Sequence, residues 1–389
     1  MKTALRRSLG VLASLRLTVV CLAVALVLVF AGTLAQVNLN PFEAQQQYFQ
    51  SWFIWWSTAS GGFTLPVFPG GHFVGAVLLL NLIAAHIHRF SWGWRKAGIQ
   101  LTHLGLIIML AGGLATDLFS VSSHMYLRQG ETRNYSDDDA RTELAVTELT
   151  SAATNPVIAI PSEVLAACGS TSHKELPFKI IVKGFYLNAD LQMVGQQNGP
   201  SVPAASNGAG ARIGLKPLPT FTEMNKRNKT SAVVEIVPNK DGKSLGTWLV
   251  SVNIDQGQEF EVDGRHWSMD LRFARYYKDY SLSLISFTHE TYPGTEIAKG
   301  FSSVITLTDP KHNENRQVKI YMNHPLRYQG DTYYQAGYQA DDSTILQVVR
   351  NPSYQAPYIS CIIVSLGLLM QFTYHLVGFA RRNNAATAP

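Results

Sequence analysis

Three histidines, His86, His103 and His375, lie within apolar runs, each three to seven residues from a neighbouring Arg or Lys. On helices that separation is roughly 5 to 10 Å, so all three belong to the same half of a bilayer crossed by these runs. An ionisable side chain at that depth is costly unless it faces a partner, a cavity or a cofactor. A neutral imidazole can bind haem iron axially, which makes His103 the candidate axial ligand. A partner protein, His86 or His375 would supply the second ligand.

Glycines on the segment that carries His103 strengthen this interpretation. Gly105 and Gly112 are seven residues apart and share one helix face, with Gly98 and Gly113 on the same segment. Small residues let a flat cofactor or a neighbouring helix approach the backbone closely. Gly105 is therefore a candidate cofactor contact. The simpler alternative is ordinary helix packing, with each histidine hydrogen-bonded inside the protein.

The apolar runs that position these residues are long enough to cross a membrane. At about 1.5 Å per residue, roughly 20 residues span a hydrocarbon core of about 30 Å. Four segments qualify, at about residues 17–37, 71–88, 97–117 and 356–380. Residues 1–16 and 381–389 flank the first and last of them, and 120–355 separate the third from the fourth.

Positive charge predicts the orientation of these spans. Lys and Arg are concentrated in 1–16, between the second and third spans, and in 381–389, whereas 38–70 contain none. By the positive-inside rule both termini face the cytoplasm and residues 120–355 lie outside, with the protein in the cytoplasmic (inner) membrane. A cleavable secretory signal at the N-terminus is the alternative, but the first apolar run is longer than a usual signal core and further spans follow.

The segment 120–355 is predicted to be antiparallel β structure. Ten short runs rich in β-branched and aromatic residues are separated by turn formers. Asn239–Gly242 and Val262–Gly264 are hairpin signals. A mobile loop is expected near 194–217, where Gly, Asn, Ala, Ser and Pro dominate. The predicted fold is thus an α-helical bundle of four transmembrane helices with a large inserted extracytoplasmic β domain, a sandwich or an open barrel.

Several function classes are excluded by what the sequence lacks. The three cysteines form no CxxC pair, so the chain has neither a dithiol redox motif nor a covalent c-type haem attachment motif of its own. Phosphate-binding, dinucleotide-binding, zinc-protease and serine-hydrolase motifs are absent. The excess of positive charge flanks the spans, which indicates membrane lipid and not nucleic acid as its partner.

Three motifs resemble the ResB/CcsB family of system II cytochrome c biogenesis. They are Ser14–Val19 running to Gly32–Gln36, Thr102–Leu106 ending in Ala111–Gly113, and Met322–Tyr328 followed by Tyr333–Tyr338. Asn351-Pro352 before the last span adds to the resemblance. The motifs cover both ends of the chain and the late β region, whereas about 150–260 match no family pattern.

The resemblance implies a haem-handling role without catalysis by this chain. Members hold haem b within the membrane, and a histidine of their third span, which aligns with His103, is an axial ligand. They work with a CcsA-like multi-span haem-handling protein that presents haem to apocytochrome c, whose thiols a thioredoxin-like protein keeps reduced. The chain is then a non-catalytic subunit of a cytochrome c haem lyase or synthetase complex.

Two other hypotheses remain open from the residues. The chain is a b-type haem electron-transfer subunit if two of its own histidines bind one haem. It is a plain membrane anchor if the β domain binds another extracytoplasmic protein and the membrane histidines serve only packing.

Overall fold

The computed structural model describes residues 10–57, 64–88, 93–149, 155–167, 169–195, 202–221, 227–295, 298–339 and 343–386. The chain forms two compact units. The membrane unit combines Met1–Val121 with Asn351–Pro389, and the β unit is Ser122–Arg350. Parts of three predicted segments lie outside the described residues: 1–9 of the N-terminus, 387–389 of the tail and 196–201 of the expected loop.

Among the described residues of the membrane unit, four helices are long and apolar enough to cross a bilayer. They are α2 (Leu15–Ala35), α4 (Gly71–His88), α5 (Trp94–Phe119) and α7 (Ala356–Ala386). Large apolar side chains such as Phe30, Leu80 and Phe372 are exposed on them. Exposure of this kind is expected where lipid covers the helices. The chain is therefore a multi-pass membrane protein.

The connection between α2 and α4 contains regular structure. Its elements are α3 (Pro41–Ala44), the π-helical turn η1 (Gln45–Phe49) and an antiparallel hairpin of β1 (Phe53–Ser57) and β2 (Thr64–Pro69). Asn81 ties α4 to the start of α2, because its Nδ2 donates to the Leu12 carbonyl at 2.5 Å and its Oδ1 accepts from Thr18 at 2.7 Å. A buried amide satisfied in this way fixes how two apolar helices meet.

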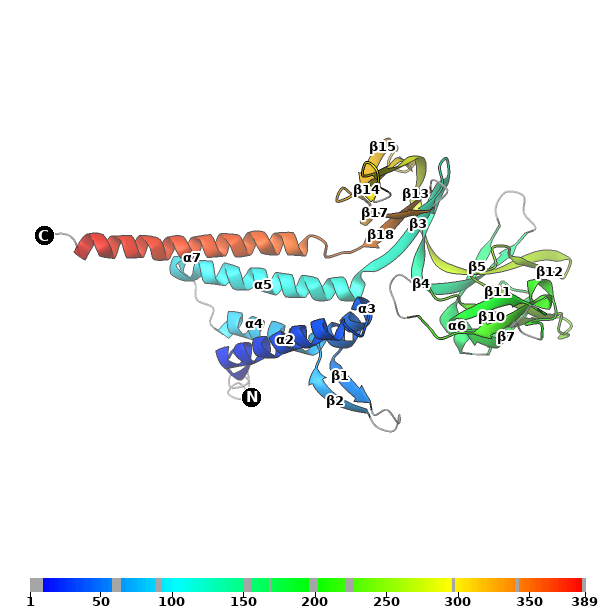
Figure 1. The fold of residues 1–389 in the computed structure, drawn as a ribbon, viewed down its shortest axis with the longest axis horizontal. Coiled ribbons are helices and arrows are strands. Elements are labelled where there is room, and N and C mark those ends of the chain that lie inside the picture. Colours follow the sequence, from blue (N-terminus) through cyan, green and yellow to red (C-terminus); the bar gives the residue numbers. More distant parts are fainter. Residues whose placement is uncertain are drawn as a thin grey trace. The chain divides into compact units, whose positions relative to one another are not determined.

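Small residues repeated every seven positions join α5 to α7, which run side by side in Figure 1. Three contacts follow the interface: Ser353 Oγ donates to the Gly112 carbonyl at 3.0 Å, Ser360 Oγ donates to the Gly105 carbonyl at 2.7 Å, and Gly367 lies against Gly98. A Cβ at Gly105 would lie 2.6 Å from Val364 Cγ2 and 3.0 Å from the Ser360 carbonyl oxygen. Only glycine fits at such a backbone approach.

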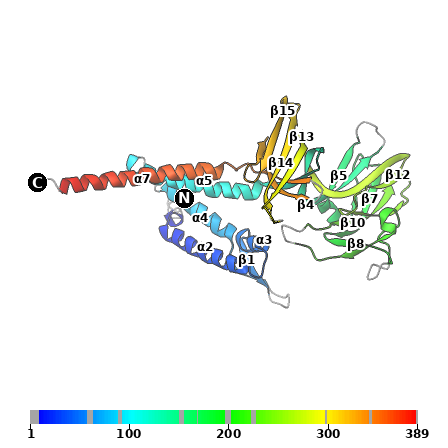
Figure 2. The same ribbon diagram turned by 45° about the horizontal axis from the view of Figure 1, so that its top comes forward.

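The β unit has two lobes that share two long strands, β4 (Thr132–Glu148) and β13 (Arg265–Thr291), as Figures 1 and 2 show. The first lobe also contains β5 (Val157–Pro161), α6 (Ser162–Ala166), β6 (Ser170–Thr171), β7 (Phe178–Tyr186), β10 (Ser231–Pro238), β11 (Gly246–Ser251) and β12 (Gln258–Val262). Phe178, Trp248 and Trp267 lie in its core.

The second lobe is a nearly closed antiparallel barrel. Its strand order is β15 (Glu314–Tyr321), β14 (Ala298–Asp309), β13, β4, β3 (Val121–Leu127), β18 (Ser343–Arg350), β17 (Asp331–Gln339) and β16 (Leu326–Tyr328). Between β15 and β16 the described residues form one isolated bridge, Tyr321 with His324. Inside, Ser303 Oγ donates to Gln335 Oε1 at 2.6 Å and links β14 to β17. The second lobe thus has its own core.

The predicted fold class is confirmed, since four long apolar helices accompany a large antiparallel β unit. The segment predicted as a loop near 194–217 contains regular structure in its described part. A 3-10 turn, η2 (Gly208–Ala211), and strand β9 (Ile213–Pro217) form there, and β9 pairs with β8 (Ala189–Met193). Gly210 is buried against Ala205 and Leu249, so tertiary packing organises a sequence of low apolar content.

Candidate functional site

The structure brings two of the predicted histidines together. His86, in the last turn of α4, and His103, in the third turn of α5, have ring centres 6.4 Å apart at an interplanar angle of 70°. Both side chains are partly buried. The two helices follow each other in the chain through a short connection, which places the end of one beside the beginning of the next.

The separation of the two rings suits a shared metal atom. An imidazole nitrogen binds a metal at about 2 Å. The ring centre lies about 1 Å beyond that nitrogen, so two axial imidazoles on one iron have centres roughly 6 Å apart. The spacing of His86 and His103 is thus close to the value that would allow both rings to hold one haem.

The other two predicted site residues lie elsewhere. His375 is exposed on α7, and its Nε2 is 2.7 Å from the side-chain nitrogen of Gln371. Gln371 in turn borders Gly98. Gly105 is buried against α7, and not beside an open slot, because Val364 and the Ser360 backbone fill the space next to it. The glycines therefore position α5 while its histidine faces α4.

A second polar pair at the far end of α4 and α5 was missed by sequence reasoning. His72 Nε2 lies 2.9 Å from Asp117 Oδ2, and Gln50 Nε2 donates to Asp117 Oδ1 at 3.3 Å. His72 precedes His86 by 14 residues, and Asp117 follows His103 by 14. The equal spacing of 14 residues on two neighbouring antiparallel helices is the signal that the sequence contains. At about 1.5 Å per residue, it places the two polar pairs about 21 Å apart along the interface between α4 and α5.

The described residues give no support for a site that binds a metal ion without a porphyrin. No group of three or more His, Cys, Asp or Glu that could hold a metal ion occurs among the described residues. Haem requires only one or two protein ligands, because the porphyrin supplies the other four.

The motif between Met322 and Tyr338 forms a buried polar network in the second lobe. Asp331 is fully buried and accepts from Arg350 at 2.7 Å and from Lys278 at 2.8 Å. Burial opposes ionisation of Asp331, but the hydrogen bonds from Arg350 and Lys278 outweigh it and hold its pKa below the usual range. Tyr280 donates to the same carboxylate at 3.1 Å, and burial raises its pKa. Removal of one partner would leave a buried charge unpaired, which is strongly destabilising.

Asp309 anchors the neighbouring part of the motif. It accepts from Tyr328 at 2.8 Å and from Gln329 at 2.7 Å. Burial opposes its ionisation, yet hydrogen bonds from Tyr328 and His312 lower the pKa of Asp309 to about 2. Gln329 and Gly330 both have positive φ, at 46° and 83°, and form the two-residue turn between β16 and β17. The polar side chains around Asp309 are thus hydrogen-bonded to one another, and this network holds the end of the barrel together.

Comparison with known proteins finds one family and two relatives that parts of the chain resemble. Residues 242–345 match the ResB-like family. Over 311 residues the chain is 23% identical to Protein NrfI of Wolinella succinogenes, covering 75% of the chain and 29% of that relative. Over 100 residues it is 36% identical to the cytochrome c biogenesis protein CcsB of Synechococcus sp., covering 26% of the chain and 22% of that relative. The matches thus span under a third of either relative. They confirm the resemblance drawn from the motifs.

Proposed function

We propose that this chain, which resembles the ResB-like family, is a haem-handling membrane subunit in cytochrome c biogenesis. In this proposal it holds haem b within the membrane and helps deliver it across for covalent attachment to apocytochrome c. The name of the Synechococcus relative, a cytochrome c biogenesis protein, supports the assignment to that pathway. Haem handling by this chain itself is our inference from its own residues.

One observation carries the proposal, the facing rings of His86 and His103 at 6.4 Å inside the membrane unit. Haem brings an iron atom that accepts axial imidazoles and a porphyrin that suits an apolar environment. His103 supplies a neutral ring nitrogen on one side. His86 supplies the second, or yields that position to a histidine of a partner protein once haem is passed on.

The remaining membrane residues position His103. The packing of Gly105 and Ser360 fixes α5 against α7, so the opposite face of α5 is presented to α4 in one orientation. No bond-making residue is required in this chain, because attachment of haem is completed elsewhere in the complex.

The proposed topology follows from charge. Positive charges lie near the ends of three helices, at Arg16 of α2, Arg95 and Lys96 of α5, and Arg381 and Arg382 of α7. With these clusters in the cytoplasm, both termini are cytoplasmic and the β unit is extracytoplasmic. His86 and His103 then lie in the inner half of the membrane, and His72 with Asp117 in the outer half.

We further propose the partners that such a subunit needs. A CcsA-like multi-span protein would receive haem, apocytochrome c would accept it, and a thioredoxin-like protein would keep the acceptor thiols reduced. The β unit would form part of the exit site and dock the acceptor. This assignment to a complex rests on the family and on the placement of the β unit as one large inserted unit.

A b-type haem electron-transfer subunit is a second candidate, favoured by the same observation. Both rings of the facing pair come from this chain, as that role requires. The two functions differ in what the chain does alone. An electron-transfer subunit purified by itself retains one redox-active, low-spin haem per chain, whereas a delivery subunit passes haem to covalently loaded cytochrome.

The proposal is tested by haem staining of c-type cytochromes in cells that depend on this chain for their maturation. His103→Ala should abolish covalently bound haem while apocytochrome and the variant chain persist in the membrane. His375→Ala, in which an exposed membrane histidine is removed, is the matched control and should retain maturation. Full maturation after replacement of His86, His103 and His375 together would instead assign the chain the role of a plain anchor.

A further inference from the structure

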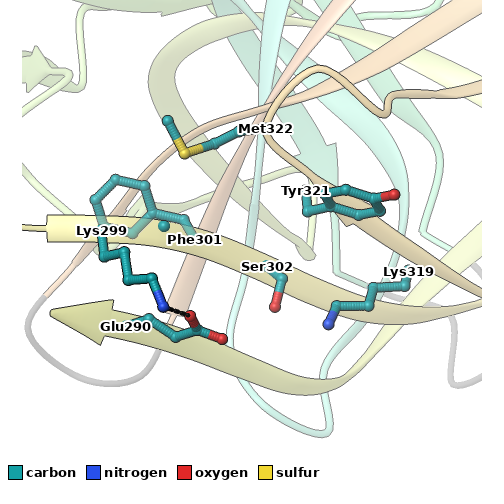
Figure 3. A pocket seen from close by; sticks show the side chains of 8 residues that line it. Glu290, Lys299, Phe301, Ser302, Lys319, Tyr321 and Met322 are labelled. Atoms are coloured by element: carbon teal, nitrogen blue, oxygen red, sulfur yellow. Dashed lines mark ion pairs between the residues drawn. The ribbon is translucent and has the colours of Figure 1, made fainter. Parts of the chain in front are cut away.

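A pocket of about 280 Å³ lies on the second lobe, within the segment that matches the family. We name it the β15 pocket. Its lining comes from the adjacent ends of β13, β14 and β15: Glu290, Lys299, Gly300, Phe301, Ser302, Lys319, Tyr321 and Met322. Figure 3 shows Lys299 and Lys319 on opposite sides of Ser302, and it shows Phe301 and Met322 above Lys299. The pocket thus combines two cations with an apolar, aromatic wall.

Stacked rings support the apolar wall. Phe301 stacks on His289 with ring centres 4.9 Å apart and an angle of 16°, and it contacts Tyr338 at 5.2 Å. Tyr321 stacks on His324 at 4.0 Å and 15°. Such stacks hold flat faces rigidly and offer them to a flat ligand at little entropic cost. The absence of a side chain at Gly300 leaves the floor open beside Met322.

The charges of the pocket favour an anion. Lys319 points its ammonium group over the ring of Tyr321 at 5.9 Å, and Lys299 lies 3.7 Å from Glu290, a loose and exposed pair. Exposed pairs of this kind contribute little stability, so a ligand carboxylate competes easily for Lys299. The pocket volume is at the lower end for a drug-sized ligand, so it takes one edge of a larger molecule.

A buried polar atom in the same wall lacks an internal partner. His289 Nε2 is buried and has no hydrogen-bond partner among the described residues. Buried polar groups are nearly always hydrogen-bonded, and exceptions call for an explanation such as a missing ligand. His289 does not line the β15 pocket itself, but it stacks directly on Phe301, which does.

We propose that the β15 pocket binds the carboxylate-bearing edge of a porphyrin, with Lys319 and Lys299 contacting the propionates and Phe301, Tyr321 and Met322 contacting the ring. The inference deepens the proposed function, on which it rests, by adding a site on the β unit where haem is held after it leaves the membrane histidines. The occupant is a flat molecule with paired carboxylates, a description that haem satisfies by its own chemistry.

The test uses the full chain in lipid nanodiscs with iron-free protoporphyrin IX, which keeps both carboxylates and needs no axial histidine. Illuminated in air, this porphyrin generates singlet oxygen that oxidises nearby methionines to sulfoxides. Met322 and Met193 are almost equally exposed, at 52% and 50%, and they lie in different lobes. The expected result, measured by mass spectrometry, is oxidation of Met322 several times faster than that of Met193.

Charge variants then locate the binding. Lys319→Glu should weaken porphyrin binding about tenfold, the loss expected for one charge-assisted contact, and bring oxidation of Met322 down to the Met193 rate. The dimethyl ester of the porphyrin should behave in the same way. Lys216→Glu, a matched reversal at an exposed lysine of β9, should leave oxidation of Met322 unchanged.

The outcomes separate this proposal from the function on which it rests. Equal oxidation of Met322 and Met193, or fast oxidation of Met322 that survives Lys319→Glu, overturns the β15 pocket as the site. His103→Ala does not touch this pocket and should leave the oxidation pattern intact. Loss of haem from the membrane histidines is measured separately, by haem absorbance. Each proposal can therefore fail while the other stands.

Discussion

The two faces of α5 carry different chemistry and meet different neighbours. One face has glycines every seven residues and accepts hydrogen bonds from Ser353 and Ser360, so α5 and α7 meet at backbone distance. The other face carries His103, whose ring meets His86 of α4. The comparison shows that the close backbone packing and the histidine contact lie on different faces of this helix. A rigid glycine face allows the histidine face to hold a fixed orientation.

Gly105→Leu is expected to give the largest effect, because it breaks the glycine face. A Cβ there already lies within 2.6 Å of Val364, and the rest of the side chain has no space. We expect a loss of roughly 3 kcal/mol or more in the free energy of unfolding, at the upper end for overpacking. Thermal unfolding in detergent measures it.

Gly113→Leu is the matched control for that change. Nothing lies within 4 Å of a Cβ at Gly113, which belongs to the same helix. The variant should unfold like the unmodified chain. Equal destabilisation by the two substitutions would mean that α5 has no special glycine face.

Ser360→Ala tests the same α5–α7 interface, with a smaller expected loss of stability. It removes the 2.7 Å hydrogen bond from a buried hydroxyl to the Gly105 carbonyl without adding bulk. We expect a loss of about 1 kcal/mol, the usual contribution of one such bond. Ser365→Ala, at an exposed position of the same helix, should cost nothing measurable in the same unfolding assay. If both serines behave alike, the hydrogen bond does not stabilise the interface.

Low pH provides a test that is specific to the β unit. The pKa of Asp309 is lowered to about 2 from an ordinary value near 3.9. A lowered pKa stabilises the fold above about pH 4, and this contribution is lost as the pH falls through 2. Asp309→Asn should flatten the fall in β-unit stability across that window, as followed by circular dichroism, whereas Glu259→Gln at an exposed site should not. An unchanged acid profile in Asp309→Asn would contradict the assignment.

Much of the fold could be predicted because its signals are local. The length of the apolar runs predicted the four helices, and short runs rich in β-branched and aromatic residues predicted the strands. The Asp263-Gly264 turn was predicted from two residues, and it forms with both φ angles positive between Val262 and Arg265. Each of these features depends on a few neighbouring residues.

What could not be predicted depends on residues far apart in the chain. The sequence placed His86, His103 and His375 at one depth but could not say which two share an interface. Gly105 could equally have bordered a cofactor or a helix, and only the position of α7 decides between them. The bend that divides β4 and β13 into two lobes requires matched irregularities in both strands, which periodicity does not reveal.

The central claim is that a nitrogen of His103 binds haem iron. The most direct measurement is the absorption spectrum of haem in the chain purified with a co-expressed partner. His103→Ala should lose the low-spin haem bands, and added imidazole should restore them, whereas His375→Ala should keep them. Undiminished haem with an unchanged spectrum in His103→Ala would contradict the claim.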